Sequence, residues 1–163
     1  MADAADSKSA EGNLVRVRLS PRASVHMAMV PSFMSWAYPM AKQRILVADD
    51  DPGIRRTLQI GLTKAGYEVV EARDGAEAMR LWRDDGADLV ISDIYMPDKD
   101  GLEVIRELRA ESPTTPVIAM TDGGRSKNLD PLRHSKTFGA ARTITKPFTL
   151  EEMLAIVKQV LAG

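Results

Sequence analysis

Five polar side chains in this chain stand at or directly after short apolar segments, each of a kind typical of a buried strand. They are Asp49, Asp50, Asp93, Thr121 and Lys146. Carboxylates that come together without a counter-charge repel one another and raise one another's pKa values. A bound divalent cation relieves that repulsion, and a lysine across the cluster supplies a second positive charge. These residue types therefore predict one site held together by opposite charges.

The chemistry that suits these residues is phosphoryl transfer. Oxygen ligands without cysteine or a suitably placed histidine favour a hard cation, and two carboxylates with open coordination positions suit Mg²⁺. Thr121 adds a hydroxyl donor, and Asp93 can itself be the nucleophile that forms an acyl phosphate. Such transfer mainly needs positioning and charge neutralisation, and this set of residues offers both.

The elements that position these residues alternate regularly from Lys42 onward. Short apolar segments predict strands at residues 45–48, 67–71, 88–92, 116–120 and 142–145. A helix is expected after each strand, because an N-cap residue precedes each amphipathic stretch. The predicted N-caps are Asp51, Asp74, Asp100, Asp130 before Pro131, and Thr149 with Glu152.

This alternation predicts an α/β fold with a parallel sheet and helices on both of its faces. Parallel neighbouring strands need crossover connections, which are nearly always right-handed. In such sheets the ligand site lies beyond the carboxyl ends of the strands. The five polar residues should therefore gather at one edge of the sheet.

Several charged residues have simpler interpretations than a role in the site. Asp51 is most simply a helix N-cap, and His26 and His134 are better explained as surface residues than as phosphate-relay histidines. Lys146 alone would be read as a solvated surface lysine. The proline that follows it, Pro147, and its place after the fifth strand favour the site instead.

Composition sets limits on the class of protein. The chain has 163 residues, a formal net charge of −1 and no cysteine, so it gives no electrostatic case for nucleic-acid binding and excludes disulfides. No apolar stretch approaches the roughly 20 residues that span a bilayer. We expect a cytoplasmic protein with no membrane contact, in which residues 1–39 are a disordered or optional extension and residues 42–163 form one domain.

From about Lys42 to Ala162 the chain resembles the receiver domain of bacterial response regulators. The motifs ILVADDDPGIRR, VISDIYMPDKDG, VIAMTD and ITKPF stand in the family's order and near its spacing. The resemblance implies a doubly wound, flavodoxin-like (βα)5 fold with a five-stranded parallel sheet of order 2-1-3-4-5. It also implies that Asp93 is the phosphoacceptor, supplied by a sensor histidine kinase or a histidine phosphotransfer protein.

The resemblance further implies a role for each site residue. Asp50 and Asp93 would bind Mg²⁺ directly together with the backbone carbonyl of Tyr95, and Asp49 would bind it through water. Lys146 would pair with the phosphoryl oxygens, following a cis peptide bond to its proline. Thr121 would report that the phosphoryl group is present.

Two positions depart from the family pattern. Thr143 stands where the family commonly has an aromatic residue that rotates inward on activation. Asp122 stands where a small residue usually borders the phosphoryl pocket, so its carboxylate could repel the phosphoryl group or point to water. The connection that begins at Gly123 also looks longer than usual.

We expect a stand-alone, chemotaxis-regulator-like receiver, because the chain ends about one residue after the last predicted helix. It would be a signalling phosphoacceptor rather than an enzyme, and phosphorylation would switch a surface that binds an unknown downstream protein. Two alternatives are an interaction module that does not need phosphorylation and a small phosphatase with an aspartyl nucleophile. Such phosphatases typically carry a second aspartate two positions after the nucleophile, where this chain has Tyr95.

Overall fold

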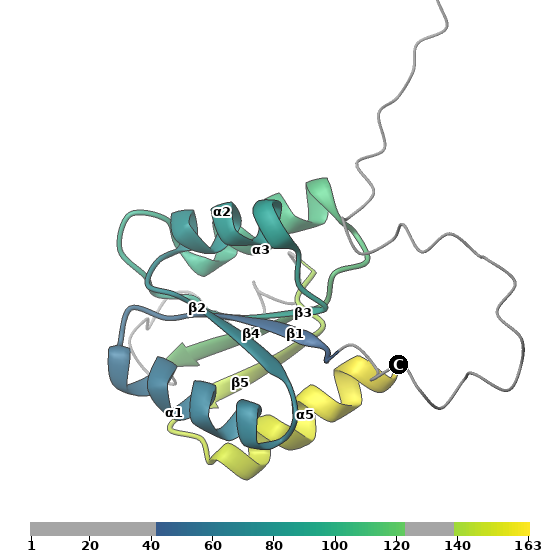
Figure 1. Ribbon diagram of the computed structural model, residues 1–163. Helices are drawn as coiled ribbons and strands as arrows, with labels where there is room; N and C mark the ends of the chain where they lie inside the picture. The colour runs from purple at the N-terminus through teal and green to yellow at the C-terminus, as the bar shows by residue number, and fades with distance from the viewer. Residues whose placement is uncertain (1–41, 123–138) are drawn as a thin grey trace, which may run out of the picture.

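A computed structural model describes residues 42–122 and 139–163, which are drawn in colour in Figure 1. Five parallel strands form one sheet in the order β2-β1-β3-β4-β5. The strands are β1 (Arg44–Ala48), β2 (Glu68–Ala72), β3 (Leu89–Asp93), β4 (Val117–Asp122) and β5 (Arg142–Lys146). The predicted α/β fold and its strand order are confirmed.

Four helices of the described part cover the two faces of this sheet. They are α1 (Pro52–Lys64), α2 (Gly75–Asp85), α3 (Gly101–Glu111) and α5 (Leu150–Ala162). Helices α2 and α3 lie on one face, and α1 and α5 lie on the other (Figure 1). The fourth helix expected from Pro131 and the extension over residues 1–39 lie outside the described residues. None of the helices in the described ranges is long and apolar enough to cross a membrane.

The helices begin where the sequence predicts, because local side chains satisfy their first backbone N–H groups. The Asp51 carboxylate accepts hydrogen bonds from the amides of Gly53 and Ile54, at 2.7 and 3.3 Å. Thr149 and Glu152 form the predicted capping box of α5. At α2 and α3 the carboxylates of Asp74 and Asp100 accept hydrogen bonds from the amides of Glu77 and Glu103. These caps fix the points at which the chain leaves the sheet.

The core consists of two layers, one on each side of the sheet. Side chains alternate along a strand, so Leu46 and Ala48 face the α2 and α3 side while Ile45 and Val47 face the α1 and α5 side. All five residues of β3 are buried. This double burial explains why the central strands read as continuous apolar segments.

The strands extend further toward the site than the sequence predicts. Asp93 is the last residue of β3 and pairs in register with Met120 of β4. Asp122 still belongs to β4 and pairs with Lys146, the last residue of β5. The sequence predicts that these strands end at Ser92, Met120 and Thr145, whereas backbone pairing continues one or two residues beyond. Three residues of the predicted site, Asp93, Thr121 and Lys146, therefore stand on the strands themselves.

Candidate functional site

Three aspartates meet at the carboxyl edge of the sheet. Asp49, Asp50 and Asp93 each offer a carboxylate oxygen, and these oxygens all lie within 4.8 Å of one another. The proximity follows from the pairing of β1 with β3, which sets Ala48 opposite Ser92. Asp49 and Asp93 are buried, whereas Asp50 is exposed. The sheet therefore brings together side chains that are 43 residues apart in the sequence (93 − 50).

Lys146 reaches this cluster from β5. Its Nζ donates a hydrogen bond to Asp49 Oδ2 at 2.8 Å and lies 3.0 Å from Asp93 Oδ1. The peptide bond between Lys146 and Pro147 is cis, as the resemblance implies. Burial by itself would lower the pKa of Lys146, but its contacts with Asp49 and Asp93 outweigh burial and raise the pKa above its ordinary value. The ammonium group therefore stays charged and neutralises part of the cluster.

The surroundings of Asp93 change the pKa of its carboxyl group. The pKa of Asp93 is raised from 3.8 to about 6, chiefly by burial and also by the neighbouring charges of Asp49 and Asp122, while Lys146 acts in the opposite direction. One lysine is thus insufficient to neutralise the negative charge gathered here. The site is electrostatically suited to an additional cation.

Two buried oxygen atoms in the described part of the chain have no hydrogen-bond partner. They are Asp93 Oδ1, which has only the ion-pair contact with Lys146, and Thr121 Oγ1. Both residues are almost fully buried, at 3% and 1% exposure. Leaving a buried polar atom unpaired costs roughly 1–3 kcal/mol. Unpaired buried atoms of this kind call for an explanation, and a bound ion or anionic group would supply partners for both.

The donor set fits Mg²⁺. It consists only of oxygen atoms, it is strongly negative, and it leaves room for ligands from water or a substrate, all of which suit a small hard cation. Asp49, Asp50 and Asp93 are the residues that could hold the ion. The proposed participation of the Tyr95 carbonyl stays a prediction; the Tyr95 side chain itself is exposed.

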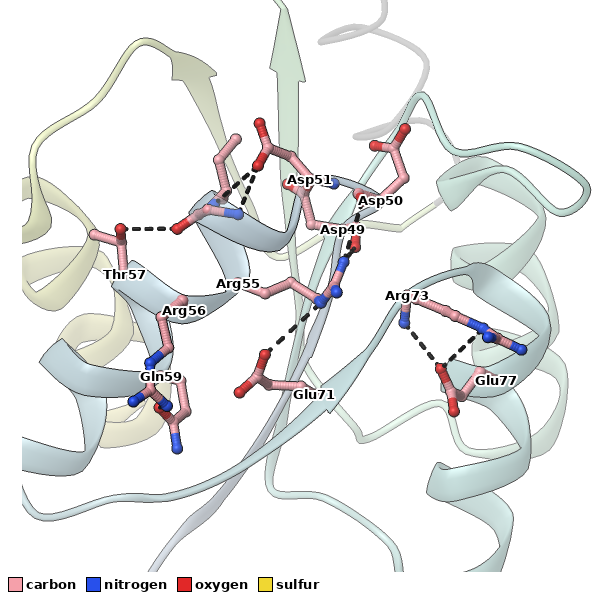
Figure 2. Close-up of polar contacts among 12 residues, drawn as sticks. Asp49, Asp50, Asp51, Arg55, Arg56, Thr57, Gln59, Glu71, Arg73 and Glu77 are labelled. Atoms are coloured by element: carbon pink, nitrogen blue, oxygen red, sulfur yellow. Dashed lines mark hydrogen bonds and ion pairs between the residues drawn. The ribbon is translucent and has the colours of Figure 1, made fainter.

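Arg55 belongs to the site although the sequence analysis did not identify it. Its Nη1 donates to the backbone carbonyl oxygens of Asp49 and Asp50, at 2.7 and 3.2 Å. Its Nε lies 3.7 Å from Glu71 Oε2 at the end of β2, and Figure 2 shows the guanidinium group between these partners. The signal available in the sequence was a basic residue one helical turn after an acidic triplet.

Of the two departures from the family pattern, Asp122 acts on the acidic cluster, whereas Thr143 pairs with Ala119 further along the sheet. Asp122 is half-buried, and its charge helps to raise the pKa of Asp93. It also lines a cavity of about 540 Å³ beside Lys146. The residues that line this cavity include the apolar Ile54, Leu58, Phe148 and Leu150. Thr143 is half-buried on β5.

Comparison with known proteins gives one consistent result. The family model described as the response regulator receiver domain matches residues 45–158. The protein named response regulator MprA of Mycolicibacterium vanbaalenii is 40% identical over 122 residues, which are 72% of this chain and 50% of MprA. A probable transcriptional regulator, ycf27 of Porphyra purpurea, is 40% identical over 124 residues, 74% of this chain and 48% of that protein. The chain thus spans about half the length of these curated relatives.

Solved structures share the fold. Chemotaxis protein CheY4 of Vibrio cholerae superposes with a TM-score of 0.67 at 32% identity, covering 74% of this chain and 99% of CheY4. A CheY-like receiver domain protein of Methanospirillum hungatei gives a TM-score of 0.70 at 30% identity, covering 75% of this chain and 95% of that one. The matched region therefore corresponds to nearly the whole of these two structures.

Proposed function

The chain belongs to the response regulator receiver domain family, and we propose that it is a phosphorylation switch in which Asp93 accepts a phosphoryl group from a phosphohistidine partner. The observation that carries this proposal is the state of Asp93 itself. It is a buried carboxylate with a raised pKa, and its Oδ1 has only the ion-pair contact with Lys146 Nζ, at 3.0 Å. A sensor histidine kinase or a histidine phosphotransfer protein would supply the group.

The reaction exchanges one bond to phosphorus for another. A carboxylate oxygen of Asp93 attacks the phosphorus atom and forms an acyl phosphate, while the bond from phosphorus to the donor imidazole nitrogen breaks and its electron pair stays on that nitrogen. Bound Mg²⁺, held by Asp49, Asp50 and Asp93, would supply charge neutralisation for the phosphoryl oxygens. Because Asp93 must be ionised to attack, the reaction should slow at low pH, and a bound cation should move that fall to a pH below the metal-free pKa of about 6.

Lys146 and Thr121 would bind the transferred group from the other side. The Lys146 ammonium is already within hydrogen-bonding distance of Asp93 and can turn to the new phosphoryl oxygens. The Thr121 hydroxyl, buried and without a partner, can donate to one of them. These new bonds would favour one conformation of β4 and β5 over another, which is how a phosphoryl group can bias a protein-binding surface.

The relatives differ in what accompanies the receiver region. MprA and ycf27 are about twice as long as the matched region, whereas CheY4 is covered almost completely. We propose that this receiver acts through a changed protein surface and as a phosphoacceptor rather than an enzyme, in the manner of a single-domain regulator. That the described domain does not itself contact nucleic acid stays a prediction.

An interaction module that does not need phosphorylation is the second candidate, and Asp122 is the observation that favours it. A carboxylate whose charge already acts on Asp93 opposes the arrival of a phosphoryl group. The phosphatase alternative has less support, because the residue two positions after Asp93 is Tyr95 and not an acid.

Phosphorylation with a small acyl-phosphate donor separates these functions. The protein would be incubated with Mg²⁺ and the donor, and intact mass would be measured for the wild type and for Asp93→Ala. We expect one added phosphoryl group in the wild type, none in Asp93→Ala, and retention of the adduct in Asp98→Asn, a matched change at an exposed aspartate in the connection that follows β3. Absence of an adduct in the wild type would favour the interaction module, and continuous turnover of added phosphate esters would favour the phosphatase.

A further inference from the structure

We propose that Arg55 is a positioning residue for the divalent cation. Its guanidinium group would hold the backbone of the acidic turn so that the carboxylate of Asp50 faces Asp93 at the spacing that Mg²⁺ requires. This inference rests on the function proposed above, because it assumes that the acidic cluster binds a divalent cation. A residue of α1 that is not itself a metal ligand would thus contribute to metal binding.

The contacts of Arg55 are directed at the backbone of the site. One nitrogen, Nη1, bonds to the carbonyl oxygens of two successive residues, Asp49 and Asp50, at 2.7 and 3.2 Å. Hydrogen bonds from a charged donor are roughly twice as strong as neutral ones. On its other side the guanidinium is 3.7 Å from the Glu71 carboxylate, which orients its plane from the end of β2 (Figure 2). Arg55 therefore ties together the ends of β1 and β2 and the first turn of α1.

Asp50 depends on this contact more than Asp49 does. Asp49 is fully buried, and its carboxylate bonds to Lys146 Nζ and to the amide of Asp51. Asp50 is exposed and stands after the end of β1, so the direction of its side chain is set by the backbone of the turn. The bond from Arg55 to the Asp50 carbonyl fixes that backbone directly.

The charge of Arg55 and its geometry predict opposite effects on the metal. A guanidinium next to a cation site repels the cation, so a purely electrostatic role means that removal of the charge strengthens binding. A positioning role means that binding weakens when the guanidinium can no longer contact the two carbonyl oxygens and Glu71 at once, even when the charge is kept. Arg55→Lys keeps the charge but loses this two-sided contact, because an ammonium is a compact point charge without the planar guanidinium.

A comparison of Mg²⁺ with Ca²⁺ gives a second way to distinguish a positioning role of Arg55 from an electrostatic one. Mg²⁺ demands near-ideal octahedral geometry, whereas Ca²⁺ tolerates irregular and flexible sites. A displaced Asp50 carboxylate should therefore cost Mg²⁺ more affinity than Ca²⁺. A change of charge acts on both ions alike, since both carry two positive charges. The ratio of the two affinities isolates the geometric effect from the electrostatic one.

The experiment measures dissociation constants for Mg²⁺ and Ca²⁺ by amide chemical-shift titration of the full chain. Arg55→Lys should weaken Mg²⁺ binding about tenfold, at the lower end of the effect of outer hydrogen-bond partners on metal affinity. It should weaken Ca²⁺ binding less than about threefold. Arg56→Lys is the matched control, because Arg56 is the next residue of α1 and bonds instead to Gln59 at 2.9 Å on the exposed surface (Figure 2). The control should leave both constants unchanged.

Three outcomes would overturn the inference. If Arg55→Lys weakens the binding of Mg²⁺ and Ca²⁺ equally, Arg55 supports the fold without positioning the Asp50 carboxylate. If Mg²⁺ binding is tighter or unchanged in Arg55→Lys, Arg55 does not position the site. Should Arg55→Lys fail to give a folded spectrum, Glu71→Gln tests the same point by loosening the guanidinium, and it should lower the preference for Mg²⁺ over Ca²⁺ about twofold. An unchanged preference in Glu71→Gln would then reject the inference.

Failure of the proposed function gives a different result. In that case the wild type itself shows no Mg²⁺-dependent shifts at Asp50 and Asp93, and Asp50→Asn behaves as the wild type does. If the wild type binds Mg²⁺ and Asp50→Asn does not, the metal site stands whatever Arg55 does.

Discussion

Asp93→Asn should stabilise the protein at neutral pH in the absence of divalent cations, although it removes the central residue of the site. In the folded chain the pKa of Asp93 is raised from 3.8 to about 6, chiefly because the carboxyl group is buried. The side chain is almost fully enclosed, so solvent screens this effect little. Asparagine has nearly the same shape and never takes on the charge.

The size of the effect follows from the shift in pKa. A difference of about two units corresponds to about 3 kcal/mol in the free energy of unfolding, at 1.36 kcal/mol per unit. Below pH 3.8 the carboxyl group is protonated in both states and contributes nothing. As the pH rises from about 4 to about 6 the unfolded chain loses its proton first, so the wild type becomes less stable, and above about 6 the full cost is present. We therefore expect Asp93→Asn to gain about 2–3 kcal/mol at pH 7.5 and about 1 kcal/mol at pH 4.5.

Urea unfolding followed by circular dichroism, with a chelator present, measures this difference at the two pH values. Asp98→Asn is the matched control, because Asp98 is exposed in the connection that follows β3 and its φ of 65° is one that asparagine also adopts. Its effect should be small at both pH values. An equal change in stability for Asp93→Asn at pH 4.5 and 7.5, or a loss at pH 7.5, would refute the argument that burial of this charge opposes folding. Mg²⁺ should raise the stability of the wild type more than that of Asp93→Asn.

Two further predictions follow from the same edge of the sheet. Gly101→Ala places a Cβ atom 2.1 Å from the backbone carbonyl oxygen of Asp93. This overlap should lower the free energy of unfolding by about 3 kcal/mol, despite the better helix propensity of alanine. Urea unfolding measures the change, and a neutral or stabilising result would contradict the packing at the start of α3. Lys146→Met removes the cation that contacts Asp49 and Asp93, and breaking a buried pair in this way costs about 3–5 kcal/mol. The loss should be smaller at pH 5, where Asp93 is protonated, and a loss that is the same at pH 5 and 7.5 would count against charge repulsion as its cause.

The alternation of strands and helices could be predicted because its causes are local. The N-caps at Asp51, Asp74, Asp100 and Thr149 act on amides two or three residues away, and their hydrogen bonds are present. The sequence places the ends of β3, β4 and β5 one or two residues before Asp93, Asp122 and Lys146, where the structure ends them. Hydrophobicity marks where a strand is buried, whereas pairing with a neighbouring strand decides where it ends.

The sequence by itself determined which residue types would meet at one edge of the sheet, because parallel strands place all their carboxyl ends there. Only the tertiary structure decided that Asp49 is buried while its neighbour Asp50 is exposed. It also decided that Lys146 bonds to a carboxylate 97 residues away and that Arg55 holds the acidic turn. Burial and charge interactions depend on groups that are distant in the chain, so the acidity of Asp93 and the partners of Arg55 follow from packing and could not be read from local sequence.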